Sequence, residues 1–123
     1  MAAIICNVSS NTVFASWYKS STYGAVASTT TDTFTANTWN HFAVVYDSVA
    51  RQMRIFLNGL AGTTATLEAA SNYSIANNQQ LKIGTYSDGF FDFSTYIDDF
   101  RITQGVARYI NNFTPPQRQF PDQ

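Results

Sequence analysis

Two neighbouring carboxylates, Asp98 and Asp99, are the side chains of this chain that come nearest to an acid/base pair. A glycosidase needs two carboxyl groups about 5 to 9.5 Å apart that flank the scissile bond. Adjacent residues of a strand point to opposite faces of its sheet, so these two side chains do not converge on one substrate. Glu68 is the only glutamate and is remote from them in the sequence. We therefore expect no acid/base catalysis from this pair.

The other residues that could carry chemistry are isolated. His41 is the only histidine and Cys6 the only cysteine, and no Gly-x-Ser-x-Gly nucleophile motif occurs. A zinc site would need further nitrogen or sulfur ligands. We expect a partly buried His41, hydrogen-bonded at a strand edge, and we expect a protein that is not an enzyme and uses no cofactor or metal. The weaker alternative is a calcium site among four aspartates, although their segment lacks the acidic density of a dedicated loop: Asp88, Asp92, Asp98 and Asp99.

The composition narrows the classes of partner. Charged residues make up 12% of the 123 residues, against about 25% in an average domain, and the net charge is −1. Seven lysines and arginines leave no electrostatic footprint for nucleic acid or for an anionic membrane. The first residues lack the basic start of a signal peptide. Length and uniform composition predict one domain over residues 1–123. The low net charge gives weak repulsion between copies, which suits a protein that works in an assembly.

The chain reads as β-structure almost throughout, because runs rich in Val, Ile, Thr, Tyr and Phe are separated by Asn, Gly, Ser and Asp. Roughly nine short strands predict an all-β, two-sheet antiparallel sandwich. The clearest of them span residues 3–8, 12–19, 23–29, 41–47, 52–59, 60–68, 81–86 and 95–103. Both faces of 41–47 are largely apolar, which predicts a central strand.

Asn58-Gly59 is the strongest short hairpin signal in the sequence. A type I′ turn requires positive φ at both central residues, which Asn and Gly tolerate best. We therefore predict a two-residue turn between 52–57 and the strand that follows.

The segment around the two aspartates has a broken alternation. Phe100 and Ile102 share one face of a strand, whereas Ile97 is out of phase with them by one residue. If all three anchor the core, the extra residue forms a β-bulge at Asp98 and Asp99. A carboxylate at such a bulge can accept a hydrogen bond from an unpaired backbone N–H group.

The end of the chain has a different character. Residues 104–109 predict a single helical turn, and the proline-rich tail predicts an extended C-terminal arm from about residue 111. Two alternatives stay open for this arm: it docks onto a neighbouring subunit, or it folds back on its own sheet. The residues expected to make the contact are Phe113, Pro115, Pro116 and Phe120.

Three separated motifs, together spanning about residues 36–116, resemble the laminin-G-like branch of the concanavalin A-like lectin/glucanase superfamily. The motifs are Trp39 with His41 where a strand starts, Asn58 with Gly59 where a strand ends, and the closing stretch from Ile97 to Ile102. The resemblance implies a jelly-roll sandwich without catalytic function, since the Glu-x-Asp-x-x-Glu strand of the hydrolase branch has no counterpart. The N-terminal part looks shortened, so that the chain is either a minimal sandwich or one whose edge strand comes from a partner.

The closing residues, from Gly105 through Pro116, look like the form found in bacteriophage virion proteins. The resemblance implies a structural protein located in the virion, namely a capsid cement or decoration subunit or a small tail component. Its expected partners are other virion proteins and further copies of itself.

The alternative is a carbohydrate-binding module for host-surface recognition. An aromatic-rich loop combines rings with hydrogen-bonding groups, as lectin-type sites do. Its candidate contacts, to a glycan or to a protein partner, are Tyr86, Asp88, Phe90 and Phe91. A loop of this composition can equally pack against the edge of the sandwich.

Overall fold

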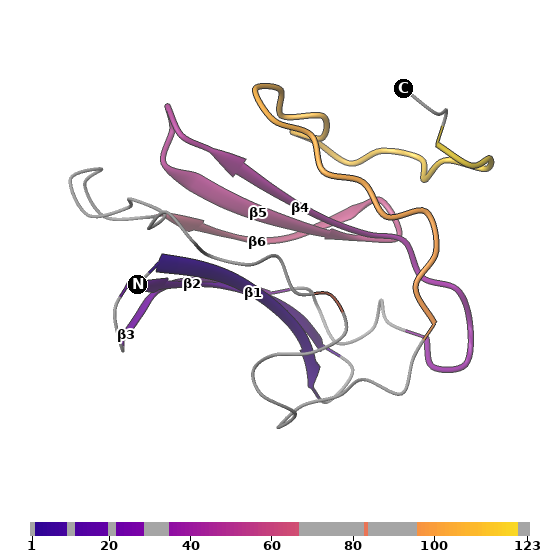
Figure 1. The fold of residues 1–123 in the computed structure, drawn as a ribbon, viewed down its shortest axis with the longest axis horizontal. Helices are drawn as coiled ribbons and strands as arrows, with labels where there is room; N and C mark the ends of the chain where they lie inside the picture. The colour runs from indigo at the N-terminus through magenta and orange to yellow at the C-terminus, as the bar shows by residue number, and fades with distance from the viewer. Residues whose placement is uncertain are drawn as a thin grey trace.

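The computed structural model describes residues 2–9, 12–19, 22–28, 35–66, 83 and 96–120. All regular structure in these residues is β, and it forms two three-stranded antiparallel sheets with the orders β1-β2-β3 and β4-β5-β6 (Figure 1). The strands are β1 (Ala2–Ser9), β2 (Thr12–Lys19), β3 (Thr22–Ser28), β4 (Phe42–Asp47), β5 (Gln52–Leu57) and β6 (Leu60–Thr66). The prediction of a mostly β protein is confirmed.

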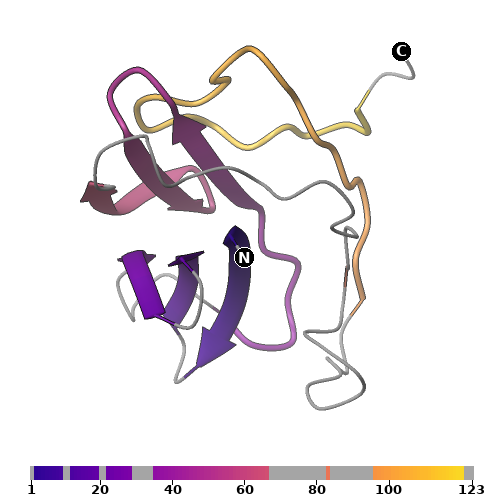
Figure 2. The same cartoon turned by 60° about the vertical axis from the view of Figure 1, so that its left-hand side comes forward.

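The two sheets pack face to face. β3 lies against β6, and both β2 and β3 lie against β5. Figures 1 and 2 show the first sheet on one side of the second, with the C-terminal segment, residues 96–120, crossing the other side. The described residues contain no helix, and therefore none that could cross a membrane.

The centre of the core is β5. Met53, Ile55 and Leu57 alternate along it and are buried, at 0%, 0% and 1% exposure. Burying a side chain of this size stabilises a fold by about 1.5–3 kcal/mol. Among the described strands, β5 pairs with both β4 and β6, so β5 is the central one there, while the sequence predicts a central strand at 41–47. Both faces of β4 are apolar because each face of the second sheet is covered by a different layer.

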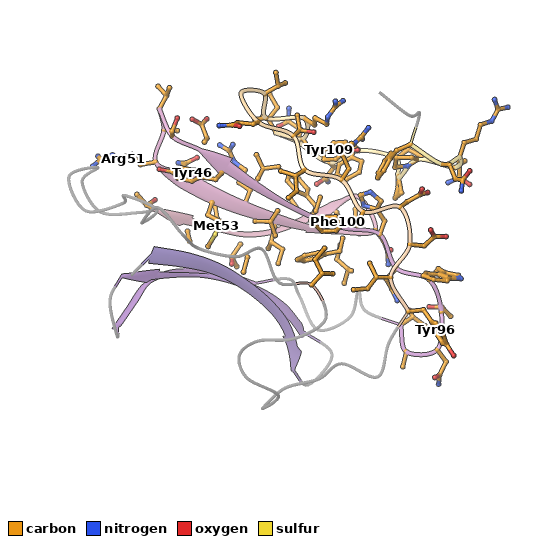
Figure 3. The ribbon with its side chains drawn as sticks, viewed as in Figure 1. Tyr46, Arg51, Met53, Tyr96, Phe100 and Tyr109 are labelled. Carbon is orange, nitrogen blue, oxygen red and sulfur yellow. The ribbon has the colours of Figure 1, made fainter. Side chains whose placement is uncertain are left out.

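Phe56 identifies the layer that covers the outer face of the second sheet. It is out of phase with the other apolar residues of β5, yet its exposure is 0%. By alternation Phe56 lies on the face turned away from the first sheet, where the rings of Tyr109 and Phe113 cover it. In Figure 3, Met53 and Tyr109 lie on opposite sides of the second sheet.

The β5–β6 turn has the predicted geometry. Leu57 pairs with Leu60, which leaves two residues in the turn. Both have positive φ, 51° at Asn58 and 82° at Gly59, as a type I′ turn requires. This prediction is confirmed.

The β4–β5 turn, residues 48–51, is held by one carboxylate. Oδ1 of Asp47 accepts hydrogen bonds from the backbone N–H groups of Val49 and Ala50, both at 2.9 Å. The turn ends at Arg51, which has a φ of 53°. The register that follows, Asp47 opposite Gln52, places Met53 on the inner face.

The C-terminal segment departs from the prediction at three points. Residues 96–103 are not a strand, residues 104–109 are not a helical turn, and the three expected core anchors are exposed: Ile97 by 53%, Phe100 by 54% and Ile102 by 64%. Asp99 has a φ of 52°, and its N–H donates to Oδ1 of Asp98 at 2.9 Å. The expected carboxylate acceptor is therefore present, but the expected β-bulge is not, because these residues pair with no strand. Positive φ at Asp99 and again at Gly105 takes the backbone out of the β region.

Gly59 offers a test of how the C-terminal segment is packed. A Cβ added there would collide with the carbonyl oxygen of Phe113 and would lie 3.0 Å from Cδ of Pro115. Gly105 has nearly the same φ, 84°, but nothing within 4 Å of an added Cβ. We expect Gly105→Ala to cost about 1–2 kcal/mol, since alanine is strained at positive φ. Gly59→Ala should cost a further ~1–3 kcal/mol because it also overpacks.

The measurement is urea denaturation of both variants beside the parent protein. Equal losses for the two variants would show that the segment does not pack on the turn.

Candidate functional site

Asn58 ties the β5–β6 turn to the start of β4. Its backbone N–H donates to the carbonyl of His41 at 2.7 Å, and its Oδ1 accepts from the N–H of His41 at 2.9 Å. Its Nδ2 donates to Oδ1 of Asn40 at 2.9 Å. Nδ2 of Asn40 in turn donates to the carbonyls of Thr35 and Thr38, at 2.8 and 3.0 Å. Two of the motifs singled out in the sequence are thus joined directly by hydrogen bonds.

The C-terminal segment binds to the same turn. The N–H of Phe113 donates to the carbonyl of Gly59 at 3.0 Å, and the N–H of Ala61 donates to Oδ1 of Asn112 at 2.9 Å. The backbone of Phe113 comes so close to Gly59 that no side chain fits between them. A glycine is therefore required here for contact as well as for φ.

Four rings form what we call the His41 cluster: His41, Phe56, Tyr109 and Phe113. Tyr109 and Phe113 are stacked, with centroids 3.7 Å apart and planes at 9°. The ring of His41 meets both nearly at right angles, with centroids 5.4 Å from Phe113 and 6.1 Å from Tyr109. Phe56 also meets them edge-on. Each such pair adds about 0.5–1.5 kcal/mol beyond the area it buries.

His41 is expected to be partly buried and hydrogen-bonded; the residue is half-buried, and its backbone N–H and carbonyl are hydrogen-bonded to Asn58. Its side chain is half-buried, but Nδ1 is fully enclosed and has no hydrogen-bond partner in the described part of the chain. Burial, and after it the positive charge of Arg101, lowers the pKa of His41 below 6.5. The site therefore favours the neutral imidazole.

Arg101 and Arg108 both make contacts within the C-terminal segment. The guanidinium of Arg101 lies over the ring of Phe120, 3.7 Å from its centroid. Nε of Arg108 donates to Oγ1 of Thr103 at 2.8 Å. Both contacts fold the segment onto itself, and the first brings positive charge towards the His41 cluster.

The residues of the expected arm differ in their surroundings. Phe113 belongs to the His41 cluster, and Pro115 lies beside Gly59. Phe120 is half-buried beneath Arg101, whereas Pro116 is exposed. The structure thus has this arm folded back on its own sheet, and a role in docking onto a neighbouring subunit stays a prediction.

The aromatic-rich loop and the metal alternative are placed only in part. Four loop residues lie outside the described residues: Tyr86, Asp88, Phe90 and Phe91. The same holds for Asp92, while Asp98 and Asp99 are exposed. Within the described ranges no three His, Cys, Asp or Glu side chains are grouped so that they could hold a metal ion.

Two of the four members of the His41 cluster, Phe56 and Tyr109, are not singled out by the sequence. The sequence predicts a helical turn at Tyr109 and no role for Asn112, yet both contact the second sheet or its turn. One signal was available in Phe56, a large apolar residue on the face of β5 that also carries Arg54. Such a residue indicates that both faces of the sheet are covered.

The comparison with protein families accounts for these motifs. The laminin G family described as the concanavalin A-like lectin/glucanases superfamily matches residues 3–107. The chain belongs to this family, whose fold implies that the two described sheets are part of a jelly-roll sandwich. The match begins earlier than the expected residue 36 and therefore includes β1 to β3. No curated protein and no solved structure matches the chain.

The role of Asn58 can be separated from its backbone conformation. Asn58→Gly keeps the positive φ but removes the side-chain bonds to Asn40 and His41, so we expect a loss of about 1–2 kcal/mol of unfolding free energy. Asn37→Gly is the matched control, because Asn37 has a φ of 57° and is exposed in a turn. Its effect should stay within about 0.5 kcal/mol.

Thermal or urea unfolding of the pair measures the difference. If Asn58→Gly is as stable as Asn37→Gly, the link between the turn and β4 does not stabilise the fold.

Proposed function

We propose that this protein is a non-catalytic structural subunit of a virus particle, a bacteriophage capsid cement or decoration protein or a small tail component. The observation that carries the proposal is the apolar surface of the C-terminal segment. Six large apolar residues of this one segment are exposed: Tyr96, Ile97, Phe100, Ile102, Val106 and Ile110. Large exposed apolar patches on soluble proteins commonly mark interaction sites.

The remaining support comes from charge and from motif. A net charge of −1 gives weak repulsion between copies, which suits a protein that functions when assembled. The assignment to a phage particle rests on the similarity of residues 105–116 to the closing motif of bacteriophage virion proteins. The non-catalytic role is supported by the site itself, where Asn40, Asn58 and Asn112 are engaged in structural hydrogen bonds.

A surface substitution tests this proposal. Ile102 and Val106 are 64% and 66% exposed, so Ile102→Asp with Val106→Asp should change unfolding free energy by no more than about 0.5 kcal/mol per site. The same double variant should lose self-association in light scattering and cosedimentation with particles that lack the protein. The charge-matched control is Thr64→Asp with Thr66→Asp on the exposed positions of β6, which should still bind.

The proposal fails if the parent protein is a stable monomer that cosediments with no virion component. It also fails if the two double variants bind equally well.

A carbohydrate-binding module is the second candidate, and exposed rings favour it. Trp39 is 72% exposed and Tyr96 is 88% exposed, and both are large enough to stack on a sugar. The polar residues around Trp39, including Asn37, could supply hydrogen bonds to hydroxyl groups.

Glycan binding distinguishes this candidate from the first. If it is correct, a glycan array gives a signal that is abolished by Trp39→Ala, Tyr86→Ala or Asp88→Ala and kept by Val49→Ala. Val49 is the matched control because it is 94% exposed in the β4–β5 turn and has no polar group or ring. An array without signal removes this candidate and leaves the structural role untouched.

A further inference from the structure

Among the described residues, the C-terminal segment is attached to the second sheet chiefly by the His41 cluster and two hydrogen bonds. It contains no strand in residues 96–120, so no ladder joins it to β4 or β6. Two hydrogen bonds link it to the β5–β6 turn, from Phe113 to Gly59 and from Ala61 to Asn112. The stacked rings of Tyr109 and Phe113 supply the apolar contact, and His41 and Phe56 are their partners on the sheet.

His41 is the one member of this cluster that can acquire a charge near neutral pH. Its Nδ1 is enclosed and has no partner within the described residues, so a proton placed there would be buried without a hydrogen bond. A buried charge without a partner is among the most destabilising features of a folded protein. The neutral ring leaves only an unpaired acceptor at Nδ1, a smaller cost than a buried charge, and packs against Tyr109 and Phe113.

The charged groups around His41 do not favour its protonation. The C-terminal segment contributes Arg101, whose charge lowers the pKa of His41, and Arg108, which is bound to Thr103. β5 contributes Arg54 on the outer face, hydrogen-bonded to Gln52, and the cluster contributes the phenol of Tyr109. The carboxylate of β4, Asp47, lies at the opposite end of the strand from His41 and binds the β4–β5 turn.

We propose that His41 is an acid-sensitive latch: the neutral imidazole holds the C-terminal segment on the outer face of β4-β5-β6, and protonation of the imidazole releases it. The segment leaves with Tyr109 and Phe113, and the outer face with Phe56 becomes accessible. This inference concerns how the segment is held and stands whether or not the protein is part of a virion.

The direction of the pH dependence follows from the pKa of His41 in the two states. Burial and Arg101 lower the pKa while the segment is attached, and release returns it towards 6.5. The attached state therefore has its full stability above pH 6.5 and loses stability as the pH falls below it. Each unit of difference between the two pKa values shifts the equilibrium towards release by up to about tenfold.

Hydrogen exchange measures the release directly. The amides of Phe113 and Ala61 donate the two hydrogen bonds that involve the segment, so their protection factors report its attachment. We expect both to fall at least tenfold between pH 7.5 and pH 5.0, while the amides of the β4–β5 ladder change less than twofold. Because His41 is the only histidine, one imidazole resonance in an NMR titration gives its pKa without ambiguity.

Two variants complete the test. His41→Phe keeps a ring in the cluster but removes the ionisable group, and its protection at pH 5.0 should equal that at pH 7.5. Arg101→Gln removes the neighbouring charge and so brings the pKa of attached His41 closer to 6.5, which should reduce the loss of protection and move the midpoint of release to lower pH.

The latch is overturned if protection of Phe113 and Ala61 in the parent protein does not change between the two pH values, or rises at pH 5.0. It is also overturned if His41→Phe loses protection as the parent does. Should His41→Phe not fold, the parent protein alone decides the matter: the imidazole titration and the loss of protection must share one midpoint.

Discussion

The approach of the Phe113 backbone to Gly59 is the contact on which the outer half of this structure depends. The two backbones are joined by a hydrogen bond of 3.0 Å, and they are so close that even a methyl group at residue 59 would collide with the Phe113 carbonyl. This contact places the ring of Phe113 over Phe56 and beside His41. Without it, the outer face of the second sheet would expose an apolar ring to water.

The three sequence motifs meet in the structure, where they join β4, the β5–β6 turn and the C-terminal segment. His41 starts β4, Asn58 and Gly59 turn β5 into β6, and Arg101 and Phe113 come from the closing segment. Backbone and amide hydrogen bonds join the first two, and ring contacts join them to the third. The residues of the three motifs thus hold three separate parts of the chain together.

The two faces of β5 have different roles. One face packs against the first sheet, and the other carries the C-terminal segment with its exposed apolar residues. Met53, Ile55 and Leu57 are fully buried towards the first sheet, where they stabilise the sandwich. Phe56 is buried under a segment that has no ladder to the sheet and that exposes Ile102 and Val106 to solvent. A rigid layer therefore supports an irregular one, and irregular segments on a rigid scaffold are where binding residues commonly lie.

The sequence by itself determined the local features. Alternation of apolar residues identified β5, and Asn58-Gly59 specified a type I′ turn because few other residue pairs tolerate two positive φ values. The carboxylate of Asp98 also accepts a backbone hydrogen bond, as its sequence position predicts. Only the tertiary structure decided that Ile97, Phe100 and Ile102 are exposed, while Tyr109 and Phe113 cover the sheet. An apolar pattern states which residues would gain from burial, but the positive φ at Asp99 and Gly105 and the contact at Gly59 decide which of them reach the sheet.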